Sequence, residues 1–166
     1  MIEVKLKRKN KYYSCFFNKK DWNLIKELKP YLVKQGNNSL RIYCNKVKNY
    51  AHRIIMKCPK GLTVDHKDNN PLNNIRSNLR ICTQKQNCKS QKIPKNNTSG
   101  YKGVSFDTWS FKKNLKRCWI ARIKVERKNI NLGRFLTKEQ AAVQYNKAAI
   151  KHFGKFAKLN KMEFKP

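Results

Sequence analysis

The chain has 166 residues and a formal net charge of +31, because 40 lysine and arginine residues face only 9 acidic residues. Such an excess destabilises a compact fold by self-repulsion, so it indicates a polyanionic partner, and nucleic acid fits best because neutralised phosphates release counterions. No apolar run approaches the length of a bilayer-spanning helix, and the charged stretch 1–13 lacks the apolar segment of a signal peptide. We therefore expect an intracellular protein that binds no membrane and consists of one domain or two small ones.

The first region, residues 1–60, alternates short β-type runs with a helical stretch. Apolar and aromatic residues predict strands at 4–6, 12–17 and 40–43. Between the second and third of these, residues 21–28 read as a short helix, with Asp21 as its candidate N-cap and Pro30 as its stop.

The second region, residues 61–91, is rich in Asp, Asn and Ser and then becomes helical. Thr83 and Gln86 have the spacing of a capping box, which places Asn87 in the first turn of the helix that follows. The stretch 92–99 is rich in turn-forming residues and is predicted to be a linker.

The third region, residues 100–162, has a regular periodicity. Residues 119–125 alternate apolar with basic side chains, which predicts a strand with one apolar and one basic face, and 129–135 form its expected partner. Thr137 and Gln140 have the spacing of a capping box, which predicts the start of a helix. The helix positions expected to pack on the sheet are Ala141, Ala142, Tyr145, Ala148, Ala149 and Phe153. The basic face of the sheet is then left free.

The six cysteines form no C-x-x-C pair, so the sequence gives little support for a structural zinc knuckle. A zinc site built from Cys44, Cys58, Cys82 and Cys88 at irregular spacing stays open as an alternative. We favour free thiols, several of them buried.

A candidate catalytic site lies where two of the scarce acids flank a histidine: Asp65, His66 and Asp68. A hard cation needs a few oxygen ligands, and a nearby imidazole can deprotonate water near neutral pH. Asp65 and Asn87 can supply the oxygens and His66 the base. We expect Asp68 to brace a loop, and His52 to be structural or to contact phosphate rather than to act as a second base.

These residues resemble the motif of the HNH endonucleases, in particular the phage-type homing endonucleases. The resemblance implies a ββα-metal fold in which His66 is the general base, Asp65 and Asn87 bind the metal, and Asn78 braces the loop and orients His66. The last position of the motif is often His and is Asn87 here. The stretches that carry the resemblance are 52–55, Gly61, 64–68, 72–74, 77–80 and 83–87.

The third region resembles the Apetala-two domain, also called the ethylene-response-factor type. The matching stretches are 99–104, 119–123, 132–135, Thr137, Glu139, 141–142, 145–146, 148–149, 153–154, Ala157 and 159–160. The resemblance implies a three-stranded antiparallel sheet that lies in the major groove of DNA, packed on one helix. The residues expected on the free face, where they can contact phosphates or base edges, are Lys102, Ser105, Arg122, Lys124, Asn129 and Asn131. A longer basic loop, 107–117, departs from the family pattern.

The sequence therefore predicts an α+β protein with an HNH nuclease domain at 1–91, a linker at 92–99 and an Apetala-two-type domain at 100–162. Its predicted function is that of a homing-type endonuclease that hydrolyses double-stranded DNA as a monomer, with Mg²⁺ or alternatively Mn²⁺ and no organic cofactor. The expected location is the cytoplasm of a bacterial or virus-infected cell. A non-catalytic transcription regulator and an RNA-binding protein are the alternatives.

Overall fold

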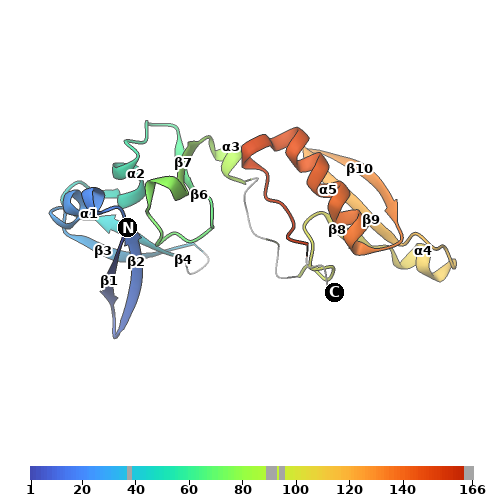
Figure 1. The fold of residues 1–166 in the computed structure, drawn as a ribbon, viewed down its shortest axis with the longest axis horizontal. Helices are drawn as coiled ribbons and strands as arrows, with labels where there is room; N and C mark the ends of the chain where they lie inside the picture. Colours follow the sequence, from blue (N-terminus) through green and yellow to red (C-terminus); the bar gives the residue numbers. More distant parts are fainter. Residues whose placement is uncertain (37–38, 89–92, 94–95, 163–166) are drawn as a thin grey trace. The chain divides into compact units, whose positions relative to one another are not determined.

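The computed structural model describes residues 1–36, 39–88, 93 and 96–162, and the chain divides into two compact units, 1–88 and 89–166. The prediction of a mixed α+β chain is confirmed, because small antiparallel sheets and helices make up both units (Figure 1). None of the helices in the described ranges combines the length and the hydropathy that a bilayer span requires.

The first unit contains three small antiparallel sheets, β1-β2, β3-β4-β5 and β6-β7. Its strands are β1 (Ile2–Arg8), β2 (Lys11–Phe17), β3 (Pro30–Gln35), β4 (Ser39–Cys44), β5 (Asn49–Tyr50), β6 (Thr63–His66) and β7 (Leu79–Cys82). Its helices are α1 (Lys19–Lys26), α2 (Ala51–Ile55), the 3-10 turn η1 (Arg76–Asn78) and α3 (Gln84–Asn87). One apolar core unites them, with Phe17, Ile25 and Ile42 among its fully buried side chains.

The three strands predicted for the first region are confirmed as β1, β2 and β4, but one strand was missed and the expected N-cap is wrong. Pro30 does more than stop the helix, because it begins β3, a strand that the sequence did not indicate. Asp21 does not cap α1: the N-cap is Asn18, and Asp21 lies within the helix. The buried Asp21 carboxylate instead accepts three hydrogen bonds from Arg76, at 2.6 to 3.1 Å.

The β6-β7 hairpin and α3 position the candidate site. The two strands pair antiparallel with Asp65 opposite Arg80, and α3 follows β7 and packs against β6. The predicted capping box is confirmed, because the Thr83 side chain accepts from the Gln86 backbone while the Gln86 side chain accepts from the Thr83 N–H. Asn87 is the last residue of this short helix.

The second unit is a three-stranded antiparallel sheet, in the order β10-β9-β8, packed on one long helix (Figure 1). Its elements are β8 (Val104–Phe106), α4 (Thr108–Lys112), β9 (Trp119–Val125), β10 (Lys128–Phe135), α5 (Lys138–Phe153) and the 3-10 turn η3 (Gly154–Phe156). Thr137 caps α5 as predicted, because its Oγ1 accepts from the Gln140 N–H. The apolar face of β9 packs on the buried alanines of α5 and on Tyr145.

Two expectations for the second unit need correction. The stretch 107–117 is not only a loop, because Asp107 caps the short helix α4 within it. The predicted linker 92–99 falls partly outside the described residues, and its end belongs to the second unit. Ser99 is only 3% exposed, and its hydroxyl donates to the Val104 carbonyl at 2.8 Å, so this residue is part of the fold.

Candidate active site

His66 ends β6 as a buried side chain with one ring nitrogen fixed. Its Nε2 lies 3.3 Å from Oδ1 of Asn74, which is itself fully buried. The Asn74 amide nitrogen donates to the Pro71 carbonyl at 3.4 Å, so the amide oxygen is the atom that faces the histidine. His66 therefore donates from Nε2, which leaves Nδ1 as the ring nitrogen that can accept a proton.

The surroundings of His66 keep the ring neutral. Burial lowers the pKa of His66 below its ordinary value, and the cation Arg41 lowers it further. The hydrogen bond with Asn74 and the carboxylates Asp68 and Asp65 act in the opposite direction, but the net change in pKa is downward. A neutral imidazole at physiological pH is the form that a general base requires.

A second buried histidine, His52 of α2, contacts the first. The two rings meet edge to face with centroids 5.3 Å apart, and the other side of His52 stacks on Tyr50 at 5.5 Å. Burial, with smaller effects of His66, Arg41 and Arg53, lowers the pKa of His52 to about 3. His52 is therefore a neutral ring that supports His66.

Asp65 lies on the other face of β6 from His66, on the same face as Thr63, as strand alternation requires. The carboxylate is only 5% exposed, and its Oδ2 accepts from Nε and Nη2 of Arg80, the residue directly across the β6-β7 pair, at 2.8 and 2.6 Å. This ion pair holds the carboxylate in one orientation.

Asn78 braces the loop between β6 and β7. Its amide nitrogen donates to Asp68 Oδ1 at 2.9 Å and to the Asn73 carbonyl at 2.8 Å, and its amide oxygen accepts from the Asp68 N–H at 3.1 Å. Asp68 also accepts from Asn73, so its expected bracing role is confirmed. The side chain that contacts His66 is Asn74, however, and not Asn78, the residue expected to orient it.

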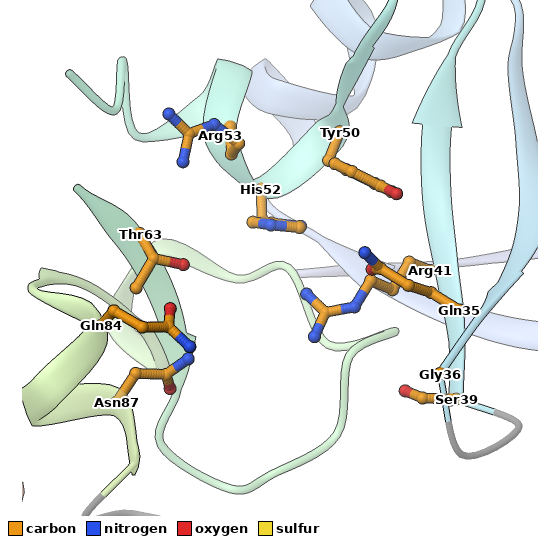
Figure 2. Close-up of a pocket in the computed structure, with 10 residues that line it drawn as sticks. All are labelled: Gln35, Gly36, Ser39, Arg41, Tyr50, His52, Arg53, Thr63, Gln84 and Asn87. Atoms are coloured by element: carbon orange, nitrogen blue, oxygen red, sulfur yellow. The ribbon is translucent and has the colours of Figure 1, made fainter. Parts of the chain in front are cut away.

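A pocket of about 460 Å³ is lined by His52, whose ring contacts His66, and by Thr63 of β6 (Figure 2). His52 lies at its centre, with Gln84 and Asn87 of α3 on one side and Arg41 of β4 on the other. No carboxylate is among its lining residues, which carry two arginines and a histidine. The pocket is therefore suited to an anion.

Asp65 and Asn87 provide hard oxygen donors of the kind that Mg²⁺ prefers, so their chemistry fits a divalent ion. Within the described ranges, no group of three or more His, Cys, Asp or Glu side chains is arranged to bind a metal. The alternative zinc site is not formed, because Cys44 is enclosed in the apolar core whereas Cys88 is exposed. The prediction that several cysteines are buried is confirmed by Cys15, Cys44, Cys82 and Cys118.

The second unit carries a polar and basic sheet face. Arg122 pairs across the strands with Asn131, and Lys124 with Asn129; all four are exposed, and cross-strand partners point to the same side. Ser105 of β8 pairs with Ile120 of β9, so it lies on that side as well. Lys102 differs, because it precedes β8 in a turn whose backbone bonds the Asn160 side chain at 2.7 and 3.1 Å.

Three features of the sites escaped the sequence. Arg41 lies on β4, far from the acidic motif in sequence, and Asn74 lies in the loop after it. Only the tertiary fold brings these two residues close to His66. A β-bulge between Asn131 and Gly133 brings Arg134 opposite Ile120, and its guanidinium bonds Asp107 and Ser110.

A buried neutral imidazole, a neighbouring pocket that no carboxylate lines and a strongly cationic chain are the features expected of an enzyme that acts on a phosphodiester. A model of the HNH endonuclease family matches residues 49–89, which include β6, β7 and α3. The chain is 34% identical over 156 residues to an uncharacterized HNH endonuclease of Acanthamoeba polyphaga mimivirus, a match that covers 90% of this chain and 76% of that protein. The chain therefore belongs to the HNH endonucleases and is a nuclease.

A second relative is similar over a shorter stretch. Protein 3.8 of Escherichia phage T7 is 42% identical over 73 residues, which make up 44% of this chain and 55% of that protein. No solved structure matches the chain. The mimivirus match is too long to fit within either unit alone, so the likeness to that relative extends across both units.

Proposed function

We propose that this protein is a metal-dependent, homing-type endonuclease that cuts double-stranded DNA, with the first unit as the ββα-metal catalytic domain and the second as the module that positions it. The observation that carries the proposal is the His66 ring, which is buried, neutral and fixed through Nε2 by Asn74. The viral and phage origin of the relatives favours action inside an infected cell.

In the proposed reaction, His66 is the general base. Its Nδ1 accepts a proton from a water molecule, and the water oxygen attacks the phosphorus in line with the leaving 3′ oxygen. The bond from phosphorus to that oxygen breaks as the new bond forms. Asn74 holds the ring in the required tautomer, while His52 and the braced loop keep it in place.

Asp65 and Asn87 are the residues proposed to hold the divalent ion, Mg²⁺ or Mn²⁺. The ion pair with Arg80 orients the Asp65 carboxylate, and Asn87 lines the pocket from α3. When bound, such an ion stabilises negative charge on the phosphate and on the leaving oxygen.

The second unit is proposed to bind duplex DNA through its exposed sheet face, in the manner of an Apetala-two domain. Arg122, Lys124, Asn129 and Asn131 form adjacent cross-strand pairs on one surface, so they can reach the same groove, and Ser105 extends that surface onto β8. Lys102 is proposed to contact phosphate from the neighbouring turn. The mimivirus match is long enough to extend into this unit, which supports a role for the unit in the same activity as the nuclease domain.

Plasmid cleavage tests the function directly. Purified protein is incubated with supercoiled plasmid and with viral and host genomic DNA, with Mg²⁺ or Mn²⁺ and then with a chelator. We expect metal-dependent cuts that disappear in the His66→Ala variant while DNA affinity is retained. Persistence of cutting in that variant would remove His66 from the reaction, and cutting in chelator would remove the metal.

A further inference from the structure

Arg41 stands apart from the other arginines around the candidate site. On β4, Ile42 and Cys44 point into the apolar core, so strand alternation directs Arg41 and Tyr43 to the opposite face. Figure 2 shows the Arg41 side chain extending from this strand into the pocket toward His52, across from Asn87. Arg41 lies outside the stretch 49–89 that matches the family model.

The Nε of Arg41 is buried, and within the described part of the chain it has no hydrogen-bond partner. The neighbouring arginines are all engaged: Arg53 donates to the carbonyls of Leu62, Cys58 and Pro59, Arg76 to Asp21, and Arg80 to Asp65. A buried donor without an acceptor costs free energy, and more when the group is charged. The acceptor that Arg41 lacks is therefore expected to come from a ligand.

The position of Arg41 defines the charge and the location of that ligand. The guanidinium is close enough to both His52 and His66 to act on each ring electrostatically, and the walls of the pocket carry no carboxylate. A ligand in this pocket meets two arginines, a neutral imidazole and side-chain amides. Such a lining favours an anion. An arginine fork matches the oxygens of a phosphate group in particular.

We propose that the pocket bounded by β4, α2 and α3 is a phosphodiester subsite, in which Arg41 donates hydrogen bonds to a DNA phosphate next to His66. The identification of this ligand as a phosphate of the DNA substrate rests on the proposed nuclease function. Arg41 thereby fixes the DNA backbone relative to the base, and its charge stabilises negative charge that develops on a phosphate held there.

A binding experiment tests the subsite without cleavage. The full chain carrying His66→Ala is titrated with a short DNA duplex in chelator, and affinity is followed by fluorescence anisotropy at several salt concentrations. Adding Arg41→Gln is expected to reduce the slope of log affinity against log salt by about 0.9, the loss of one phosphate contact. Arg41→Lys should restore most of the slope, since it keeps the charge, but only part of the affinity, since it lacks the fork.

Lys34→Gln is the matched control. Lys34 lies on β3 with its side chain on the face opposite that of Arg41, so it removes the same charge from the same sheet without touching the pocket. An Arg41→Gln slope equal to that of the parent or of Lys34→Gln would overturn the proposal. A second readout uses the parent chain: its Arg41 Nε–H resonance, assigned by its absence in Arg41→Lys, should shift when duplex is added, and an unchanged resonance would also overturn the proposal.

Cleavage by the chain with an intact His66 separates this proposal from the nuclease function. Arg41→Gln should reduce the cutting rate at saturating DNA about 100-fold, the typical effect of losing one preorganised donor, whereas Lys34→Gln should cut normally. If the unaltered chain cuts no DNA but the Arg41 slope and resonance change as expected, the subsite stands and the nuclease proposal fails. If it cuts and Arg41→Gln cuts equally well, the subsite fails and the nuclease stands.

Discussion

Replacing His52 with phenylalanine should make the first unit less sensitive to acid. The folded protein holds His52 neutral, with its pKa lowered to about 3, whereas the unfolded chain titrates near 6.5. As the pH falls from 6.5 to 3, His52 becomes protonated in the unfolded chain but stays neutral in the folded protein. The contribution of His52 to the free energy of unfolding is therefore complete above pH 6.5 and is lost as the pH falls toward 3. From pH 7 to pH 4.5 the loss from this one group is about 2.5 kcal/mol, at about 1.4 kcal/mol for each pH unit below 6.5.

The assay is urea denaturation at both pH values. Trp22, which packs on Phe17, reports on the first unit when the other two tryptophans, Trp109 and Trp119, are changed to phenylalanine. The phenylalanine ring at position 52 can keep the packing between Tyr50 and His66 but cannot be protonated. Carboxylates contribute equally to both proteins and cancel. An equal loss of stability in the protein with His52 and in the variant would refute the inference that His52 is buried as a neutral ring.

Two further predictions concern the second unit. Lys124→Ala should weaken duplex binding and reduce the salt slope by about 0.9, whereas Lys151→Ala, on the helix behind the sheet, should leave the slope unchanged in the same anisotropy titration; equal slopes for both variants would remove Lys124 from the interface. Gly103→Ala should lower the stability of this unit by about 3 kcal/mol or more in thermal unfolding, because φ is +74° and a Cβ would lie 2.1 Å from the Tyr145 ring and 2.6 Å from the Arg122 carbonyl. Gly100→Ala, at φ +77° but in open space, should cost only about 1 kcal/mol, and a similar loss for both would contradict the close-packing argument.

Local patterns in the sequence were sufficient for much of the second unit. Alternation along 119–125 predicted β9, and the apolar spacing after Thr137 predicted α5, because each pattern lies within one element and repeats with its period. The same is true of the capping box at Thr83, whose partners are three residues apart. The helix α4 escaped because its five residues are too few to show a period.

Residue types and their spacing also predicted the chemistry of the first unit. His66 and Asp65 stand next to each other in a chain with few acids, so the sequence alone could indicate a base beside a carboxylate. It could not give their pairing, because Asn74 and Arg80 reach them through the loop and the strand register of the β6-β7 hairpin.

The charge and the short-range patterns of this chain thus indicated a polyanionic partner, the segments that form the second sheet and its helix, and the histidine that is the candidate base. Only the tertiary structure decided that Asn74 fixes that histidine, that Asp21 pairs with Arg76, and that Arg41 enters the pocket. Each of these contacts joins different elements of the fold, and the last two join elements far apart in sequence. The packing of the core, and not any local preference, brings such groups together.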